Sequence, residues 1–209
     1  SNGKTTTSML TYHILKKAGL NVGLAGNIGK SFALQVAEND FDYYVLEISS
    51  FQLDYMFGFK ADVAVITNIT PDHLDRYGYK FQNYINSKFR ILQNQGAGDY
   101  FVYCADDPVT MAELQKRNIP SSKIPFSLSE LTGGDRAYVK GNEMIINLKS
   151  KIYKMRLDYL ALPGKHNIYN SMAAGIVSRI FEIRKDAIKE SMSEFQGVEH
   201  RLEFVTKVH

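Results

Sequence analysis

The stretch SNGKTTTSML, Ser1–Leu10, joins a Gly-Lys-Thr turn directly to the start of a helical pattern. A glycine, a lysine and a hydroxyl residue placed before a helix surround a phosphate with backbone N–H donors, an ammonium and a metal-binding oxygen. Lys4 is therefore expected to reach the β- and γ-phosphates of a nucleotide, and Thr5 to hold Mg²⁺. An ordinary loop lysine is the alternative, but the helix predicted at Thr5–Ala18 favours a phosphate loop.

Apolar segments alternate with helical ones beyond this loop. The predicted strands are Asn21–Leu24, Asp42–Ser49, Asp62–Asn68 and Asp99–Ala105, and the predicted helices between them are Phe32–Ala37, Phe81–Gln93 and Met111–Arg117. Such alternation is typical of a mostly parallel sheet with helices on both faces. The expected fold class is therefore α/β, with a P-loop-type, mostly parallel sheet.

The pattern changes after this region. Arg136–Leu157 alternates in polarity around a Gly-Asn turn, which predicts a small antiparallel hairpin or meander. Two predicted helices follow at Asn167–Phe181 and Lys185–Phe195, and the end, HRLEFVTKVH, is predicted to be extended.

Composition narrows the class of protein. The 209 residues are 44% hydrophobic, enough for one fairly large domain with a substantial core. The net charge of +3 comes without a basic run, so no nucleic-acid partner is expected. The single cysteine, Cys104, cannot form an internal disulfide and is expected to be a buried thiol. With no signal peptide and no long apolar stretch, we expect a soluble cytoplasmic protein with no membrane partner.

Two polar residues stand near the ends of predicted strands. Glu47 closes the run YYVLE, and α/β proteins bind ligands beyond the carboxyl ends of parallel strands. A carboxylate there suits the metal of a nucleotide, and an edge acid pointing into water is the alternative. In NITPDHLDRYG, Asn68–Gly78, Thr70 is expected to cap a helix that begins at Pro71. His73 would then lie in the first helical turn, either at a site or on the surface.

Lys88, in INSKFRIL, falls on the apolar stripe of the helix predicted at Phe81–Gln93. Burying a lysine there costs free energy of folding, unless the ammonium has a partner or extends to water. On one straight helix, His73 and Lys88 would lie about 22 Å apart at about 1.5 Å per residue. They can share a site only if the chain turns back between them, and Arg76–Gly78 is the expected break.

The last polar candidates lie near the end of the chain. Asn167 and Asn170, in GKHNIYN, are three apart at a predicted helix start, so both amides can face one ligand. The alternative is a capping Asn167 and a solvated Asn170. Arg201, in EHRLEF, carries a planar fork that suits phosphate, with a surface ion pair as the alternative.

Taken in order, seven segments resemble the central domain of the Mur ligases, the ATP-dependent amide-forming enzymes of peptidoglycan precursor synthesis. They are SNGKTTT (1–7), AGNIG (25–29), LEISSFQL (46–53), NITPDHLDRYG (68–78), SKFRIL (87–92), GKHNIYN (164–170) and EHRLEF (199–204), and together they cover essentially the whole chain. LEISSFQL followed by TPDHLDRYG resembles the branch that adds D-glutamate to UDP-N-acetylmuramoyl-L-alanine. The branch that adds L-lysine or diaminopimelate more typically has a histidine after the two serines.

The resemblance implies roles for the matching positions. The implied nucleotide-binding residues are Asn2, Gly3, Lys4, Thr5, Thr6, Asn167, Asn170 and Arg201. The implied metal-binding residues are Thr5, Glu47, His73 and Lys88, the last as a carbamate formed with CO₂. Lys4, Glu47, His73 and Lys88 are implied to be catalytic, and Asn27 and His73 to contact the muramoyl substrate. A lysine on an apolar face is more readily neutral, and only the neutral amine reacts with CO₂.

The implied reaction uses ATP and Mg²⁺ in two steps. The carboxylate of UDP-N-acetylmuramoyl-L-alanine attacks the γ-phosphate to give an acyl phosphate, and the amine of D-glutamate then displaces phosphate. Two Mg²⁺ ions and Lys4 would neutralise the phosphoryl oxygens. Family members also carry an N-terminal domain that grips UDP and a C-terminal domain that binds the amino acid. Residues 1–209 are thus expected to be an excised central domain, a monomer that makes no product alone.

Other classes of protein stay open from the residues themselves. One is a P-loop phosphotransferase or nucleotide switch, and another is a non-catalytic nucleotide-binding module. A small-molecule kinase would show an arginine-rich lid, which this sequence lacks, and a switch would need neither SSFQL nor Lys88. A different Mur ligase, or a ligase similar to folylpolyglutamate synthase, also stays an alternative, because the residues that would select the amino acid lie outside this sequence.

Overall fold

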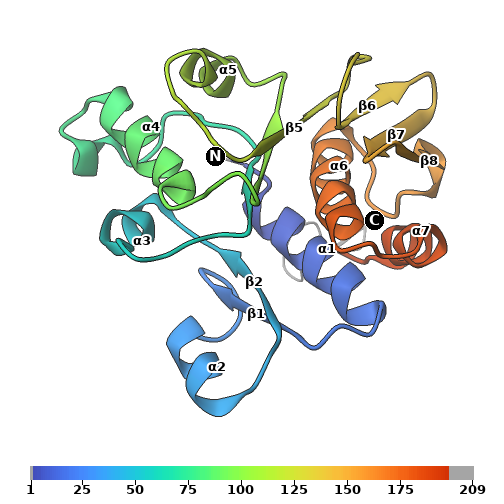
Figure 1. Ribbon diagram of the computed structural model, residues 1–209, viewed down its shortest axis with the longest axis horizontal. Helices are drawn as coiled ribbons and strands as arrows, with labels where there is room; N and C mark the ends of the chain where they lie inside the picture. Colours follow the sequence, from blue (N-terminus) through green and yellow to red (C-terminus); the bar gives the residue numbers. More distant parts are fainter. Residues whose placement is uncertain (1, 198–209) are drawn as a thin grey trace, which may run out of the picture.

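The computed structural model describes residues 2–197, which form an α/β fold with two sheets (Figure 1). The strands are β1 (Val22–Gly26), β2 (Tyr43–Glu47), β3 (Val63–Ile66), β4 (Tyr100–Cys104), β5 (Ser122–Ser127), β6 (Arg136–Lys140), β7 (Glu143–Leu148) and β8 (Lys151–Arg156). One sheet pairs β1 with β2 in parallel, and the other has the order β3-β4-β5-β6-β7-β8. The predicted fold class is confirmed.

Helices surround these strands. They are α1 (Lys4–Lys17), α2 (Phe32–Glu38), α3 (Ser50–Tyr55), α4 (Phe81–Phe89), α5 (Pro108–Leu114), α6 (Lys165–Ile180) and α7 (Lys185–Glu194), with the 3₁₀ helices η1 (Leu74–Tyr77), η2 (Arg90–Leu92) and η3 (Leu157–Tyr159). None of the helices that the structure describes is long and apolar enough to cross a membrane.

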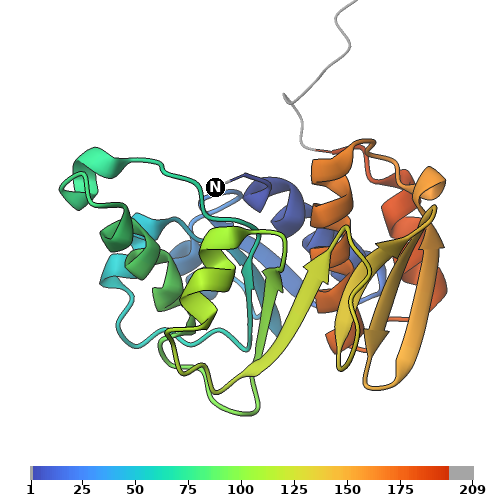
Figure 2. The same cartoon turned by 90° about the horizontal axis from the view of Figure 1, so that it is seen from above.

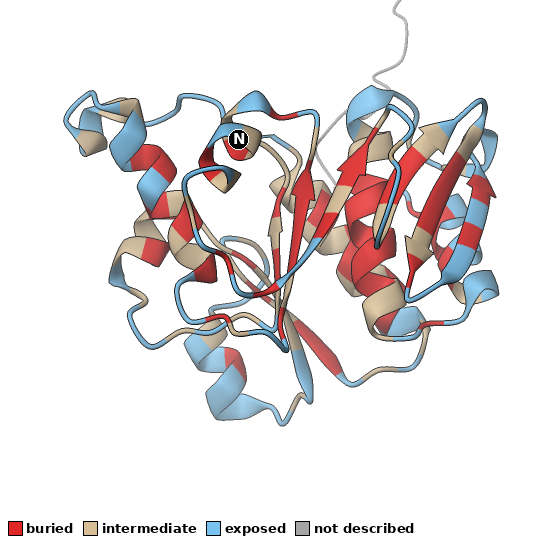
Figure 3. Ribbon diagram, turned by 45° about the horizontal axis from the view of Figure 1, so that its top comes forward, coloured by how far each residue is buried: buried red, intermediate tan, exposed pale blue. Residues whose placement is uncertain are grey.

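The two faces of the larger sheet bury separate hydrophobic clusters. Successive side chains of a strand point to opposite faces, so Phe101 and Tyr103 of β4 join a cluster with α4, whereas Val102 and Cys104 join one with α1, α6 and α7. Figures 1 and 2 show α4 and α6 on opposite sides of the strands. Figure 3 shows the buried positions concentrated on α6 and the central strands. Cys104 is a buried free thiol, as predicted.

The antiparallel part forms one edge of the larger sheet. β5 pairs with β6 in parallel, and β6, β7 and β8 then pair antiparallel with one another, which confirms the predicted meander. The Gly-Asn turn joins β6 to β7, and Lys149 and Ser150, both with positive φ, join β7 to β8. Figure 2 shows these strands at the end of the sheet far from α4.

Three local predictions differ from the structure. The sequence pattern predicts no element over α3 or β5, and it predicts that α5 begins at Met111 instead of Pro108. Asp107 caps α5 by accepting from Thr110 N–H (2.9 Å), and proline at the first helical position extends the helix backwards. The predicted extended end, HRLEFVTKVH, and with it Arg201, lies outside the described residues.

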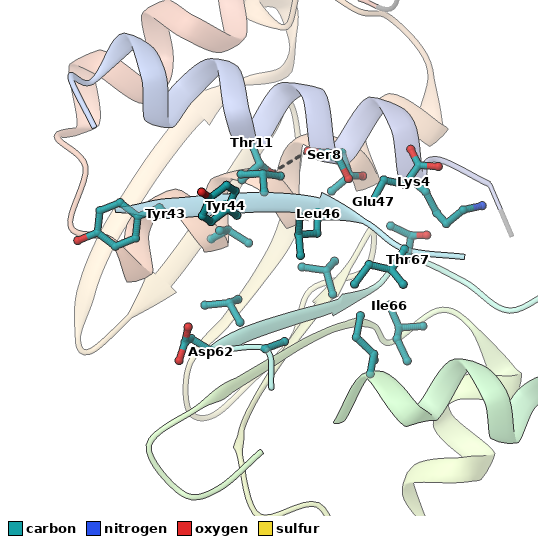
Figure 4. Close-up of a pocket in the computed structure, with 18 of the residues that line it drawn as sticks. Lys4, Ser8, Thr11, Tyr43, Tyr44, Leu46, Glu47, Asp62, Ile66 and Thr67 are labelled. Atoms are coloured by element: carbon teal, nitrogen blue, oxygen red, sulfur yellow. Dashed lines mark hydrogen bonds between the residues drawn. The ribbon is translucent and has the colours of Figure 1, made fainter. Parts of the chain in front are cut away.

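A cavity of about 380 Å³ separates the two sheets. It is lined by β2 and β3 along their length, with α1 above them (Figure 4). Among residues 2–197, neither β2 nor β3 has a strand partner on the side that faces this cavity. Because both strands are parallel to their neighbours and end at the same side, their carboxyl ends open at one mouth, where Glu47 and Thr67 lie (Figure 4).

Candidate active site

The N-terminus of α1 is shaped to receive an anion. Gly3 precedes the helix with φ +81°, a left-handed conformation that favours glycine, and the first helical turn carries no acidic side chain. The unpaired N–H groups and the positive end of the helix dipole therefore face no internal carboxylate of that turn. Lys4 reaches the mouth of the cavity, and Thr5 and Thr6 are partly exposed beside it.

The residue before Gly3 is fixed to the end of β3. The Asn68 carboxamide accepts from Asn2 N–H (2.8 Å) and donates to Asn2 C=O (2.9 Å). The Thr67 hydroxyl donates to the same carbonyl (2.9 Å). A single side chain thus pairs with both backbone groups of Asn2, which holds the phosphate loop at the carboxyl end of β3.

A second asparagine supports the loop from the other side. Asn170, in α6, is buried, and its Oδ1 accepts from the Thr7 hydroxyl (3.2 Å). A Cβ atom placed on Gly3 would lie 2.3 Å from Asn170 Oδ1, so the backbone can approach α6 only at a glycine. Asn167 donates to Pro163 C=O (2.8 Å) and lies within hydrogen-bond distance of Asn170. The two amides therefore lie together, and the Asn170 oxygen faces the phosphate loop.

Glu47 is the buried carboxylate at the end of β2. Its Oε1 accepts from the Asn27 amide (3.0 Å), and its carbonyl accepts from Asn27 N–H (2.7 Å). Gly26, at φ +99°, permits this approach, because a Cβ atom there would lie 2.2 Å from the Glu47 carbonyl oxygen. Glu47 Oε2 is buried and has no hydrogen-bond partner among the described residues. Burying a carboxylate oxygen without a hydrogen-bond donor costs free energy, and a bound cation would offset that cost.

The segment after β3 departs from its prediction. Pro71 and His73 are not helical, no helix begins at Thr70, and His73 adopts left-handed backbone (φ 50°) just before η1. The predicted helical turn is therefore wrong for His73, because the chain bends there before a short 3₁₀ helix starts. Its imidazole Nε2 lies 3.6 Å from Asp72 Oδ1, and the side chain is about half exposed.

Lys88 lines the same cavity as Lys4 and Glu47. Burial lowers the pKa of Lys88 to about 8, the positive charge of Lys4 acts in the same direction, and Asp72 opposes both. The aromatic ring of Tyr84 lies 4.8 Å from the Lys88 ammonium. Because electrostatic effects of this kind need short distances, Lys4, Asp72 and Lys88 lie near one another.

The chain does turn back between His73 and Lys88. Gly78 ends η1 in a left-handed conformation (φ 61°), Tyr79 follows with φ 56°, and α4 begins at Phe81. The break expected at Arg76–Gly78 is thus present at its last residue. It brings Lys88 towards the segment that carries Asp72.

The structure therefore gathers part of the predicted site. Lys4, Glu47 and Lys88 line one cavity. Thr5 and Thr6 follow Lys4 on α1, and Asn27 and Asn170 contact residues that line the cavity. His73 does not line that cavity but adjoins Asp72. Across residues 2–197, no three His, Cys, Asp or Glu side chains are grouped to hold a metal ion. The roles assigned to these residues stay predictions.

Three residues of this region are not predicted by the sequence pattern to be site residues. Thr67 and Asn68 hold the phosphate loop, and Asp72 acts on Lys88. The position of Thr67 and Asn68 directly after a buried parallel strand is the same signal that selected Glu47, so this rule applied to β3 would have found them.

The fold and the site define an α/β domain of the phosphate-loop type, in which the loop, a buried carboxylate and a lysine of lowered pKa lie around one cavity. The family described as Mur ligase middle domain matches residues 1–178. The chain belongs to this family.

Curated relatives match the whole of this chain over about half of their own length. A protein of Bacteroides fragilis named UDP-N-acetylmuramoylalanine–D-glutamate ligase is 57% identical over 208 residues, which covers 100% of this chain and 46% of the relative. A protein of Christiangramia forsetii with the same name is 51% identical over 209 residues, with 100% and 47% covered. The chain thus spans about half the length of the relatives it matches.

Solved structures share the fold. A UDP-N-acetylmuramoyl-L-alanyl-D-glutamate–2,6-diaminopimelate ligase superimposes with a TM-score of 0.76 at 20% identity, covering 100% of this chain and 47% of that one. A MurF ligase from Thermotoga maritima in complex with ADP gives 0.66 at 20% identity, with 95% and 47% covered.

Proposed function

We propose that this chain is the ATP-binding central domain of an enzyme that adds D-glutamate to UDP-N-acetylmuramoyl-L-alanine in peptidoglycan precursor synthesis. The observation that supports the proposal is that Lys4, Glu47 and Lys88 line one cavity, in a chain whose relatives of 44–57% identity are named as this ligase. A soluble enzyme of the cytoplasm, where ATP is available, fits the proposal.

The first chemical step would form an acyl phosphate. The substrate carboxylate attacks the γ-phosphorus of ATP, the bond between that phosphorus and the bridging oxygen breaks, and ADP leaves. Lys4 and the N–H groups at the start of α1 would bind the phosphoryl oxygens and offset the charge they gain. The Asn68 and Asn170 contacts hold the loop in shape beforehand, which reduces the reorganisation that the step requires.

Glu47 and Thr5 together fit a magnesium ion whose remaining ligands are waters and substrate phosphates. Mg²⁺ usually keeps several waters and takes only one or two carboxylates together with substrate phosphates. Glu47 would supply its buried, unpaired Oε2, and Thr5 its hydroxyl. When bound, the ion would neutralise phosphate charge, and a second ion would lie towards His73 and Lys88.

Lys88 suits a carbamate. At pH 7 an amine with a pKa of about 8 is neutral in about a tenth of molecules, far more often than an ordinary lysine. The neutral nitrogen would attack the carbon of CO₂. An N–C bond forms, one C=O π bond breaks as its electron pair moves to oxygen, and the proton of the amine leaves to water. The resulting anion lies near Lys4 and can bind a metal ion, which an ammonium cannot.

The second step would transfer the acyl group to an amine. The amino group of D-glutamate attacks the acyl carbon and phosphate leaves, with the proton of the amine passing to water or to a basic group. In the whole enzyme, the UDP and amino-acid sites would come from flanking domains of the same chain, since the relatives are about twice as long. Asn27 and His73 would contribute to the muramoyl site from this domain.

The cavity between β2 and β3 suits a strand of that longer chain. Both edges are open among the described residues, and both strands end at the mouth where Gly3 begins the phosphate loop. A strand that leads into the loop would pair with both edges and join the two sheets into one.

A single assay tests the proposed activity. The full-length protein is given ATP, Mg²⁺, UDP-N-acetylmuramoyl-L-alanine and one amino acid from a panel, and phosphate release is measured. The expected result is release that depends on the nucleotide sugar and is fastest with D-glutamate. Faster release with a different amino acid would overturn D-glutamate as the co-substrate, and phosphate transfer to a small molecule without any amino acid would indicate a phosphotransferase.

A further inference from the structure

A hydrogen-bonded junction joins η1, α3 and α4, next to the residues of the candidate metal site. The Tyr77 hydroxyl, on η1, donates to Asp54 Oδ2 (3.0 Å) and also lies 3.2 Å from Ser87 Oγ. The Ser87 hydroxyl, buried on α4, donates to Ser50 C=O (2.9 Å) on α3. The phenol oxygen of η1 therefore meets groups from two further elements, α3 and α4.

Each of these elements carries or adjoins one candidate site residue. α3 begins three residues after Glu47, the end of β2. His73 immediately precedes η1, and Lys88 follows Ser87 on α4. The junction thus connects, through short pieces of backbone, three side chains that lie far apart in the sequence.

An aromatic stack supports the junction from the side of the SSFQL motif. The Phe51 ring lies 5.1 Å from the His73 ring and 6.2 Å from the Tyr77 ring, to which it is nearly parallel. The Arg76 guanidinium covers Phe51 at 4.4 Å. Such contacts fix the direction of η1, while the Tyr77 hydroxyl fixes its distance from α3 and α4.

The left-handed backbone beside η1 makes this support necessary. His73 and Tyr79 both have positive φ, which costs free energy for residues with a Cβ atom, so surrounding contacts must hold the bend. Tyr77 lies between these two residues, and burial raises its phenol pKa, so that it stays a neutral donor at ordinary pH.

We propose that Tyr77 is a positioning residue that sets the mutual placement of Glu47, His73 and Lys88 and thereby the affinity of the metal site. The proposal rests on the function proposed above. Tyr77 itself touches neither nucleotide nor substrate in this scheme, and it acts through the three elements that its hydroxyl joins.

The test uses full-length protein with Tyr77→Phe, which removes one oxygen atom and keeps the ring. Tyr79→Phe is the matched control, because Tyr79 lies two residues away and is 79% exposed. Mn²⁺ binding in the presence of a non-hydrolysable ATP analogue is titrated by electron paramagnetic resonance, and kcat, KM for ATP and thermal melting are measured in parallel.

We expect Tyr77→Phe to weaken Mn²⁺ binding and lower kcat about tenfold each, with KM for ATP within about twofold of the unmodified enzyme. Ser87→Ala should produce the same pattern more weakly, and Tyr79→Phe should change neither quantity. A merely structural role would lower the melting temperature and the fraction of active enzyme while Mn²⁺ affinity stayed unchanged, and that result would overturn the proposal.

Glu47→Gln separates this proposal from the one on which it rests. If Glu47→Gln abolishes Mn²⁺ binding and Tyr77→Phe leaves it intact, the metal site stands and the positioning role fails. If Glu47→Gln also leaves Mn²⁺ binding intact, the metal site is misplaced and the positioning proposal fails with it, whereas the ligase activity is decided by the phosphate-release assay.

Discussion

Asn68 is the residue whose contacts explain the shape of the phosphate loop. Its carboxamide is bonded to both backbone groups of Asn2, one residue before the left-handed Gly3. Neither neighbour of Asn68 can replace it, because Thr67 offers only one bond to that carbonyl and Ile69 is apolar and buried. These contacts therefore hold the loop in one shape from within the protein.

Asn68→Ala should raise KM for ATP about tenfold in the full-length enzyme, because two hydrogen bonds of about 0.5–1.5 kcal/mol each are lost. Steady-state kinetics at saturating amino acid would measure it. Asn118→Ala, at an exposed position, is the control, and equal KM values for the two variants would show that the loop needs no such support.

Lys88→Ala should lower turnover at least about a hundredfold, since an anion that serves the metal site would be lost. Removal of CO₂ from the buffer should slow the unmodified enzyme and leave the variant unaffected. Lys80→Ala, an exposed position before α4, is the control. Full activity of Lys88→Ala would contradict the carbamate role.

At the scale of elements, hydrophobic periodicity predicted the regular strands and helices but not the backbone bend at His73. β4 alternates strictly between two cores, so its apolar run identified it directly. The bend at His73 depends on Phe51 and Tyr77, which lie on other parts of the chain, and no local pattern carries that information. α3 escaped prediction because its six residues are too few for a helical period to emerge.

A loop before β4 joins two elements through a buried carboxylate. Asp99 accepts from Gly96 N–H (2.7 Å) and pairs with Lys60 (2.9 Å), which precedes β3. The Gly96 N–H, and next the Lys60 ammonium, hold the pKa of Asp99 below its ordinary range. Because the folded-state pKa is lower than the unfolded one, this group contributes stability above a pH of about 3.9 and loses it as the pH falls further.

Asp99→Asn should therefore destabilise the protein at pH 7 and make less difference at pH 3. Urea unfolding at the two pH values measures the free energy of unfolding of each variant. Asp62→Asn is a matched control, because Asp62 lies 3.9 Å from the same lysine but its side chain is 89% exposed. An equal loss at both pH values would contradict the ion-pair account.

At the scale of the whole molecule, the separation of the two sheets and the match to about half the length of each relative lead to the same expectation about activity. The open edges of β2 and β3 face a cavity, and the relatives continue well beyond the matched region. Residues 1–209 alone should make no product from ATP, UDP-N-acetylmuramoyl-L-alanine and D-glutamate, because the substrate-binding domains would be missing. Chromatography of the reaction mixture tests this, with full-length protein as the control, and efficient ligation by the short chain would refute it.

In the candidate site too, the sequence predicted the residues that local motifs determine but not the contacts between distant segments. Lys4 and Glu47 follow from a loop motif and from a strand end, both of which are local. The proximity of Lys88 to Lys4 depends on a turn at Gly78, which the sequence indicated only as a geometric requirement. The hydrogen bonds between Asn68 and Asn2 join residues that are 66 positions apart, and neither segment alone predicts that they pair.

The most direct test of the proposed chemistry follows one oxygen atom. UDP-N-acetylmuramoyl-L-alanine labelled with ¹⁸O in its terminal carboxylate is turned over with ATP, D-glutamate and the full-length enzyme, and the released phosphate is analysed by mass spectrometry. Because the carboxylate oxygen that attacks phosphorus leaves with it, we predict one ¹⁸O in each phosphate formed with amide product. Phosphate without the label would contradict an acyl-phosphate ligase and leave this domain with a different reaction.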